Sequence, residues 1–215
     1  TEEINKRNLP CVAVDIPSGV NGNTGNVLGA APNCCLTVTF FRRKPGHLLF
    51  PGRGFCGETI SLDIGIPEDI LKKKSFSTAC NNPKLWLSSF PWAKFSDHKY
   101  KRGHALIVGG KTMTGAARLA ARSAYRIGAG MVSVAASPDV VPVYANDDPG
   151  LIIYPISEIP DFIELIKDKR KNAVLIGPGC GVSPETKEMA LESVVKGKHT
   201  VLDADALTVF KGDTS

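Results

Sequence analysis

The chain has 215 residues, of which 43% are hydrophobic, and its formal net charge at pH 7 is +5. This length and composition are typical of one large or two modest soluble α/β domains. No apolar run reaches the roughly 18 residues of a membrane-spanning helix, and the positive charge is spread along the chain without a nucleic-acid recognition motif, so we expect neither membrane nor nucleic acid as a partner.

Short apolar runs bounded by glycine, aspartate or polar turns predict the strands. These runs are Val12–Val14, Leu36–Phe40, Thr59–Ile64, Ala105–Val108, Met131–Ala135, Ala173–Ile176 and Thr200–Leu202. Helix candidates lie at residues 114–128, 138–146, 159–171 and 184–196. Continuous apolar strands that alternate with helices predict βαβ units and parallel sheets buried on both faces, so the fold class is α/β.

The helix at residues 114–128 has the clearest pattern. Its predicted apolar face consists of Ala116, Ala120, Ala124 and Ile127. Thr112 and Thr114 offer an N-cap, and Gly128 offers the stop. Residues 75–95 interrupt both periodicities with Ser, Asn, Pro and aromatic residues, as a linker does. We therefore expect one domain at residues 1–74 and a second at residues 96–215.

A first group of candidate site residues follows the strand that ends at Val14. Asp15 stands at the carboxyl end of that strand, where open α/β sheets bind ligands, and the turn at Pro17 would aim Asp15 and Ser18 into the crevice. The alternative is an aspartate that only caps a turn. Lys44 presents the same choice between a phosphate contact and a solvated strand end.

A second group follows three later strands. Glycine turns come after two of them, at Gly109-Gly110 and at Gly177-Pro178-Gly179, and they would let a ligand approach the backbone. Tight turns that bind no ligand have the same sequence pattern. Asp203 and Asp205 follow the third strand, and such a pair suits magnesium with phosphate oxygens. We expect Asp205 to cap the next helix and Asp203 to point into the crevice.

Residues Val12–Gly65 resemble the second half of the NAD(P)H-hydrate epimerase domain. The matching words are Ala13-Val14-Asp15-Ile16-Pro17-Ser18-Gly19, Thr24-Gly25, Leu36-Thr37-Val38-Thr39-Phe40, Lys44-Pro45-Gly46 and Asp63-Ile64-Gly65-Ile66-Pro67. The resemblance implies that Asp15 contacts the hydrated nicotinamide as the catalytic acid/base and that Ser18 helps bind a potassium ion. A carboxylate can accept a proton and stabilise an iminium-like cation, which this chemistry needs.

Residues 96–215 resemble the NAD(P)H-hydrate dehydratase domain, which has a ribokinase-like fold. The matching words are Ser96-Asp97-His98-Lys99, Thr114-Gly115-Ala116-Ala117, Gly128-Ala129-Gly130-Met131-Val132, Gly177-Pro178-Gly179 and Asp203-Ala204-Asp205-Ala206-Leu207. The resemblance implies that Ala116 and Gly179 contact the hydrated dinucleotide and that Asp203 and Asp205 lie near the phosphates and magnesium of ADP or ATP. We thus expect two three-layer αβα domains, a partial Rossmann-like epimerase domain and a partial ribokinase-like dehydratase domain.

The two resemblances together imply nicotinamide nucleotide repair by the complete parent protein. An isomerase would interconvert the R and S hydrates, and an ADP- or ATP-dependent lyase would dehydrate the S form to NAD(P)H. The family's phosphate-binding loop and Gly-x-Gly-Asp motif do not occur in these residues, so we expect an interior piece of the parent. The alternatives are a small-alcohol kinase of the ribokinase superfamily and an inactive remnant that only binds a ligand or partner.

The cysteines and histidines add no further site. None of the six cysteines forms a C-x-x-C pair or a zinc-spaced cluster, and no secretory leader is seen, so we expect free thiols in the cytoplasm, with a redox or metal role as the alternative. The histidines show no triad partner and are interpreted as structural or surface residues. The sequence leaves the oligomeric state open and is compatible with a homo-oligomer.

Overall fold

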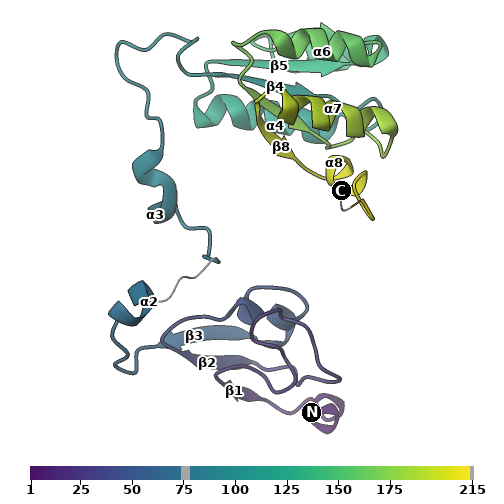
Figure 1. The fold of residues 1–215 in the computed structure, drawn as a ribbon. Coiled ribbons are helices and arrows are strands. Elements are labelled where there is room, and N and C mark those ends of the chain that lie inside the picture. The colour runs from purple at the N-terminus through teal and green to yellow at the C-terminus, as the bar shows by residue number, and fades with distance from the viewer. Residues whose placement is uncertain (74–77, 214–215) are drawn as a thin grey trace. The chain divides into compact units, whose positions relative to one another are not determined.

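The computed structural model describes residues 1–73 and 78–213, and the chain divides into two compact units (Figure 1). Unit 1 comprises Thr1–Leu85 and unit 2 comprises Trp86–Ser215. The division falls inside the predicted linker, of which residues 75–77 lie outside the described residues. The rest of that segment holds two short helices, α3 (Pro83–Trp86) and η3 (Leu87–Ser89).

Unit 1 is built on a small parallel sheet. Its elements are α1 (Glu2–Lys6), β1 (Val12–Val14), β2 (Leu36–Phe40), the 3-10 helices η1 (Pro45–His47) and η2 (Gly52–Phe55), β3 (Glu58–Leu62) and α2 (Asp69–Lys73). The strand order is β1-β2-β3, and both pairings are parallel. Because the strands are parallel, the residues that follow β1, β2 and β3 meet at one edge of the sheet.

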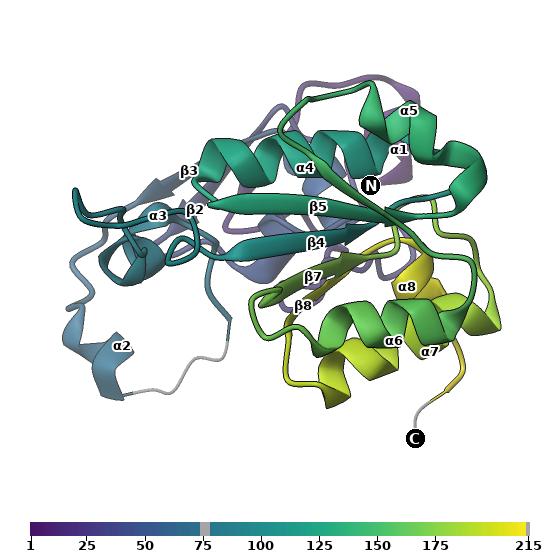
Figure 2. The ribbon, with the colours of Figure 1, turned by 90° about the horizontal axis from the view of Figure 1, so that it is seen from above.

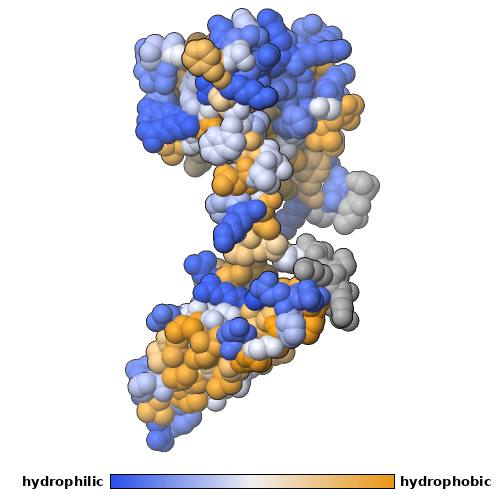
Figure 3. Space-filling model, turned by 90° about the vertical axis from the view of Figure 1, so that its left-hand side faces the viewer, coloured by the Kyte–Doolittle hydropathy of each residue, from blue (hydrophilic) through white to orange (hydrophobic). Residues whose placement is uncertain are grey.

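The two faces of this sheet differ in burial. Successive side chains of a strand point to opposite faces, so Ala13, Thr37 and Thr39 share one face, and all three are buried. The opposite face is apolar and exposed, with Val14 at 72% and Leu62 at 48% of full exposure. Figure 3 shows hydrophobic residues gathered over the surface of unit 1. Within the described residues, no helix therefore covers that face.

Unit 2 contains a larger parallel sheet. Its strands are β4 (His104–Val108), β5 (Met131–Ala136), β6 (Ile152–Pro155), β7 (Ala173–Ile176) and β8 (His199–Leu202). Its helices are α4 (Gly115–Ile127), η4 (Pro138–Val140), α5 (Val141–Ala145), α6 (Ile159–Lys167), α7 (Pro184–Val195) and α8 (Asp205–Thr208). The strand order is β6-β5-β4-β7-β8, and every pairing is parallel. The carboxyl ends of β4, β7 and β8 are therefore neighbours.

Helices cover both faces of the unit 2 sheet (Figure 2). On one face Ile107 and Val134 pack with Ala117 of α4 and Tyr144 of α5. On the other face the core includes Leu106, Val108, Val174 and Ile176 with Phe162 and Ile166 of α6 and Met189 and Ala190 of α7. The predicted α/β class is confirmed, and unit 2 has the expected three layers. No helix in the described part of the chain is long and apolar enough to cross a membrane.

The structure corrects the predicted apolar face of α4. The residues that face the sheet are Ala117 and Ala121, both fully buried, whereas Ala116 is exposed and Ile127 is 64% exposed. One residue along a helix turns the face by about 100°. The sequence offers two adjacent rows of alanine, and the buried row is the one that continues into Tyr125, which packs against the core.

Other elements, β6 and α6 among them, also differ from the predictions. Strand β6 was not expected, because it is a half-buried strand at the edge of the sheet and lacks a fully buried apolar run. Helix α6 ends at Lys167, four residues before the predicted end at residue 171. The Asp168 carboxylate accepts hydrogen bonds from the Arg170 amide and the Lys171 ammonium, which favours a turn over another helical turn.

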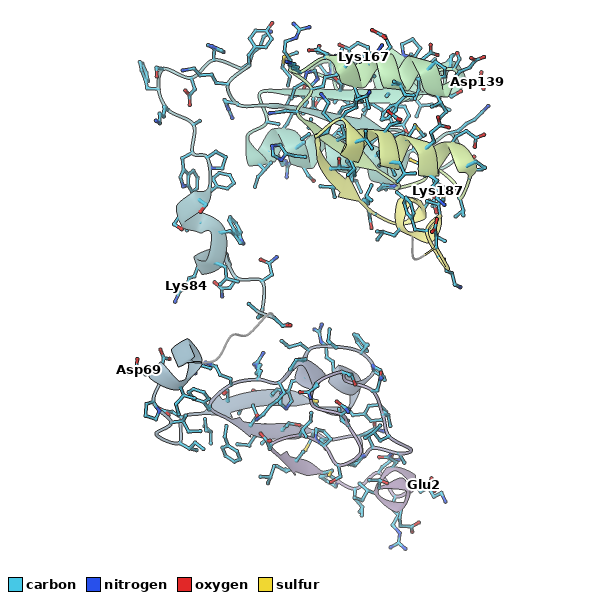
Figure 4. All side chains as sticks on the ribbon, viewed as in Figure 1. Glu2, Asp69, Lys84, Asp139, Lys167 and Lys187 are labelled. Atoms are coloured by element: carbon cyan, nitrogen blue, oxygen red, sulfur yellow. The ribbon has the colours of Figure 1, made fainter. Side chains whose placement is uncertain are left out.

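Figure 4 labels two lysines on helices of unit 2, Lys167 of α6 and Lys187 of α7. Lys187 of α7 pairs with Asp213 at 2.6 Å, and Lys167 of α6 pairs with Glu164 at 2.5 Å. Such partly exposed pairs contribute little to stability. Lys171 departs from this solvated pattern, since it is only 4% exposed and pairs with Asp168.

Candidate functional site

The first candidate site lies at the carboxyl ends of β1 and β2 in unit 1. Asp15 directly follows β1, Thr39 is the penultimate residue of β2, and Lys44 precedes η1. The Thr39 hydroxyl donates to Oδ1 of Asp15 at 2.8 Å, and the Lys44 ammonium donates both to that oxygen and, at 2.8 Å, to the Thr39 hydroxyl oxygen. A carboxylate, a hydroxyl and an ammonium thus form a closed triangle.

The backbone of Asp15 is held as tightly as its side chain. Its φ of 67° lies in the left-handed region, which is uncommon for a residue with a side chain and is tolerated best by Asn and Asp. The Asp15 amide donates to the Val38 carbonyl at 2.7 Å, and the Asp15 carbonyl oxygen lies 2.7 Å from Nε2 of His47. The Lys44 amide donates to Nδ1 of His47 at 2.9 Å, so the neutral ring carries its proton on Nε2 and donates it to Asp15.

The electrostatics of this triangle keep Asp15 ionised. The hydrogen bond from Lys44 lowers the pKa of the Asp15 carboxyl, partial burial opposes that effect, and the Thr39 hydrogen bond lowers the pKa further. The side chains of Asp15 and Lys44 remain 45% and 34% exposed, so a ligand can reach the pair. At neutral pH the site therefore presents an anion that can accept a proton or stabilise a cation.

Ser18 lies on the loop that follows Asp15. It is exposed, and within the described residues no hydrogen bond joins its hydroxyl to the Asp15 carboxylate. Gly19 fixes this loop, because its φ is +87° and a Cβ there would lie 2.1 Å from the Ala30 carbonyl oxygen. The structure thus places Ser18 on the predicted turn but gives its side chain no protein partner among the residues it describes.

The second candidate site lies where β4, β7 and β8 end in unit 2. The loops there touch through their backbones: a Cβ on Gly110 would lie 2.1 Å from the Gly179 carbonyl oxygen, and a Cβ on Gly179 would lie 2.3 Å from that of Met113. The Tyr144 hydroxyl, which is buried, donates to the Gly110 carbonyl at 2.8 Å. These contacts bring Gly179 beside the loop that leads into α4, where Ala116 is exposed in the first turn.

The start of α4 leaves backbone donors free. Thr114 is its N-cap residue, but the Thr114 side chain accepts no capping hydrogen bond, contrary to the sequence expectation. The first amides of a helix have no partner within the helix and carry partial positive charge. The geometry therefore suits an anionic group next to Gly179.

Of the two aspartates after β8, Asp205 differs from the prediction. The N-cap residue of α8 is Ala204, with φ 45° and no side-chain cap, so the expectation that Asp205 caps this helix is wrong. The sharp turn at Ala204 moves Asp205 into the helix, where its Oδ2 accepts from the Gly181 amide at 2.8 Å. Asp203 is exposed, and its Oδ1 accepts from the Ala204 amide at 2.8 Å. Within residues 1–73 and 78–213, one oxygen of each carboxylate accepts no hydrogen bond and is left for a ligand.

The structure adds residues that sequence reasoning did not select. Thr39 and His47 hold Asp15, and Tyr144 holds the Gly110 loop. The only available signal was a polar residue inside an apolar strand for Thr39, and a histidine close to Lys44 for His47. Among the described residues, no group of three or more His, Cys, Asp or Glu side chains could hold a metal ion.

In a comparison with known proteins, two family models match different parts of the chain. The family model described as NAD(P)H-hydrate dehydratase matches residues 105–215, which is 111 of the 215 residues, and the model described as YjeF-related protein N-terminus matches residues 1–46. A bifunctional NAD(P)H-hydrate repair enzyme of Coxiella burnetii is 34% identical over 96% of this chain and 42% of its own length. One of Archaeoglobus fulgidus is 35% identical over 95% of this chain and 43% of its own length.

The chain thus spans less than half the length of these two relatives. Among solved structures, a hypothetical protein of Streptococcus mutans aligns with a TM-score of 0.53 and 20% identity over 64% of this chain and 50% of its own, which is a likeness of fold. Since the dehydratase model covers more than half of the chain, the protein belongs to the NAD(P)H-hydrate dehydratase family.

Proposed function

We propose that the protein acts in nicotinamide nucleotide repair, as part of a longer enzyme that epimerises the R and S hydrates of NAD(P)H and dehydrates the S form in an ADP- or ATP-dependent reaction. Residues 1–74 are then the C-terminal part of the epimerase domain, residues 75–95 the linker, and residues 96–215 the N-terminal part of the dehydratase domain. The observation that carries the proposal is the Asp15 triangle, within a segment that the YjeF-related model matches.

The chemistry of the first site supports epimerisation. Interconversion at the hydrated ring carbon needs a group that handles a proton beside a positively charged ring. The ionised Asp15 carboxylate can do both, because it accepts a proton and stabilises an adjacent cation. Ser18 has a hydroxyl without a protein partner in the described residues, and hydroxyl and carbonyl oxygens suit potassium, so Ser18 fits the proposed potassium ligand.

The backbone geometry of the second site supports binding of a hydrated dinucleotide and an adenine nucleotide. The uncapped first turn of α4, which holds Ala116, offers amides to an anion beside Gly179. One oxygen each of Asp203 and Asp205 remains available to Mg²⁺, so the residues fit that ion. Bound Mg²⁺ would neutralise phosphate charge during the reaction. These substrates favour a cytoplasmic enzyme, and a homo-oligomer is part of the proposal.

The test uses the full-length protein with a mixture of R and S NADH hydrates, ADP or ATP, and Mg²⁺, and follows the return of reduced-nicotinamide absorbance. The wild type recovers both epimers, whereas Asp15→Asn recovers the S form at the wild-type rate and leaves the R form. Asparagine suits the left-handed backbone at this position and removes only the charge.

A matched control is Glu58→Gln, which removes an exposed carboxylate at the opposite end of the same sheet and should behave like the wild type. Equal loss of both activities in Asp15→Asn would contradict the two-site proposal. No recovery by the wild type, together with phosphorylation of a sugar or pyrimidine alcohol, would replace the repair function with that of a small-alcohol kinase.

A further inference from the structure

The two oxygens of the Asp15 carboxylate have different surroundings. Oδ1 accepts from both Thr39 and Lys44, whereas no described residue donates to Oδ2. The ammonium of Lys44 is itself fixed by its 2.8 Å bond to the Thr39 hydroxyl oxygen. The carboxylate therefore cannot rotate freely, because rotation about its Cβ–Cγ bond would break two hydrogen bonds, one of them charge-assisted.

The turn that carries Lys44 also holds the backbone of Asp15. His47 is only 3% exposed and bridges the Lys44 amide and the Asp15 carbonyl oxygen. The turn is anchored further by the Gly46 amide, which donates to the Gly22 carbonyl at 2.7 Å. A left-handed residue with a side chain persists only where its surroundings enforce that conformation, and here one four-residue turn contacts Asp15 at both its carboxylate and its carbonyl group.

We propose that Lys44 is a positioning residue for Asp15: its ammonium, together with the Thr39 hydroxyl, occupies Oδ1 and leaves Oδ2 as the oxygen that meets the hydrated nicotinamide ring. The proposal rests on the proposed epimerase function and assigns a role to a residue that the family resemblance left without one. It also explains why Lys44 is only about one third exposed, at 34%, rather than extended into solvent.

Lys44 and Asp15 then have different roles in the triangle: Lys44 keeps the carboxylate ionised, and Asp15 meets the substrate. The titratable groups that face Asp15 are Lys44 and His47, and Lys44 makes the largest contribution to the lowered pKa of Asp15. With Lys44 in place, Asp15 meets the substrate as an anion that accepts a proton or stabilises the ring cation. Without it, the carboxylate would protonate at a higher pH and would be free to rotate.

The test compares Lys44→Met, Lys44→Arg and the control Arg43→Met. Arg43 is the neighbouring cation, but its guanidinium donates to the Thr59 carbonyl at 2.8 Å rather than to Asp15. Two measurements are made on each protein: the pKa of the Asp15 carboxyl by carbon NMR, and the pH profiles of kcat and KM for epimerisation by the full-length protein. Circular dichroism verifies that each variant is folded.

Lys44→Met should raise the pKa of Asp15 and move the acid limb of the kcat profile to higher pH. Its kcat should fall by about a hundredfold, the lower end of the range for acid–base groups, while KM changes little. Lys44→Arg should retain the low pKa and much of kcat, and Arg43→Met should match the wild type. A folded Lys44→Met protein with an unchanged Asp15 pKa and pH profile would overturn the proposal.

The two measurements also separate this inference from the proposed function. If the Asp15 pKa rises in Lys44→Met but the wild type does not epimerise NAD(P)H hydrates, the epimerase function is wrong while the hold of Lys44 on Asp15 stands. If the wild type epimerises and Lys44→Met lowers kcat without a shift in pKa or pH profile, the positioning role is wrong while the function stands.

Discussion

The closest backbone approach in unit 2 gives a sharp prediction for Gly177→Ala. Gly177 directly follows β7 and has φ +127°. A Cβ at this position would lie 1.7 Å from the Asp203 carbonyl oxygen and 3.0 Å from the Ala206 Cβ. No rotamer relieves these contacts, because the Cβ position is set by the backbone. The β7 and β8 loops must therefore move apart in the variant.

The expected cost has two parts. A side chain in a sparsely populated backbone region costs about 1–3 kcal/mol, and insertion of a carbon into a closely packed contact costs about 1–3 kcal/mol more. Gly177→Ala should thus lower the free energy of unfolding of unit 2 by about 2–6 kcal/mol. Gly181→Ala is the matched control, because Gly181 has φ +86° but open space around its Cβ position. Only the backbone part, about 1–3 kcal/mol, applies there.

Amide hydrogen exchange locates the loss of stability of each variant within the chain. Amides of β7 and β8 should exchange faster in Gly177→Ala than in Gly181→Ala, whereas amides of β2 in unit 1 should be unchanged in both and serve as an internal control. The proposed dehydratase activity of the full-length protein should fall in parallel, since Gly179 lies on the same loop. Equal protection of β7 and β8 in the two variants would refute the claim that a close backbone approach shapes this site.

Two further predictions concern the core of unit 2. Phe162→Ala removes a fully buried ring and should cost about 3–5 kcal/mol by urea denaturation, whereas Phe95→Ala, at a fully exposed position, should cost almost nothing; equal effects would contradict the assigned core. Burial, aided by Lys171, lowers the pKa of His104, so the folded state disfavours the proton that the unfolded chain binds as pH falls below about 6.5. Unit 2 should therefore lose stability between pH 7 and pH 5, and His104→Gln should lessen that loss in thermal melts.

The strands were the most predictable part of the fold. Runs such as Leu36–Phe40 and Ala173–Ile176 coincide with the observed strands, because parallel strands buried on at least one face need apolar or β-branched residues over their whole length. The end of α4 was equally predictable, since Gly128 adopts the left-handed conformation that ends a helix. In both cases the sequence signal lies within one short segment.

The contacts around Asp15 could not be predicted in the same way. Asp15 follows a strand in the sequence as it does in the structure, but its partners Thr39 and Lys44 lie 24 and 29 residues further along the chain. Only the parallel register of β1 and β2 brings Thr39 beside Asp15, and only the turn of η1 returns Lys44 to the sheet edge. Likewise, the sequence pattern predicted Asp205 as the N-cap of α8, but the backbone turn makes Ala204 the N-cap residue.

The two candidate sites are built by different physical means, and mutations should reveal this. In unit 1 the reactive groups are side chains at an exposed edge of the sheet. Asp15→Asn changes the charge of the site and Lys44→Arg changes the length of the cationic side chain, while the backbone contacts remain. In unit 2 the loops are shaped by backbones in direct contact, so one added carbon at Gly177 disturbs stability and binding together. Activity should therefore separate from stability in the first site and follow it in the second.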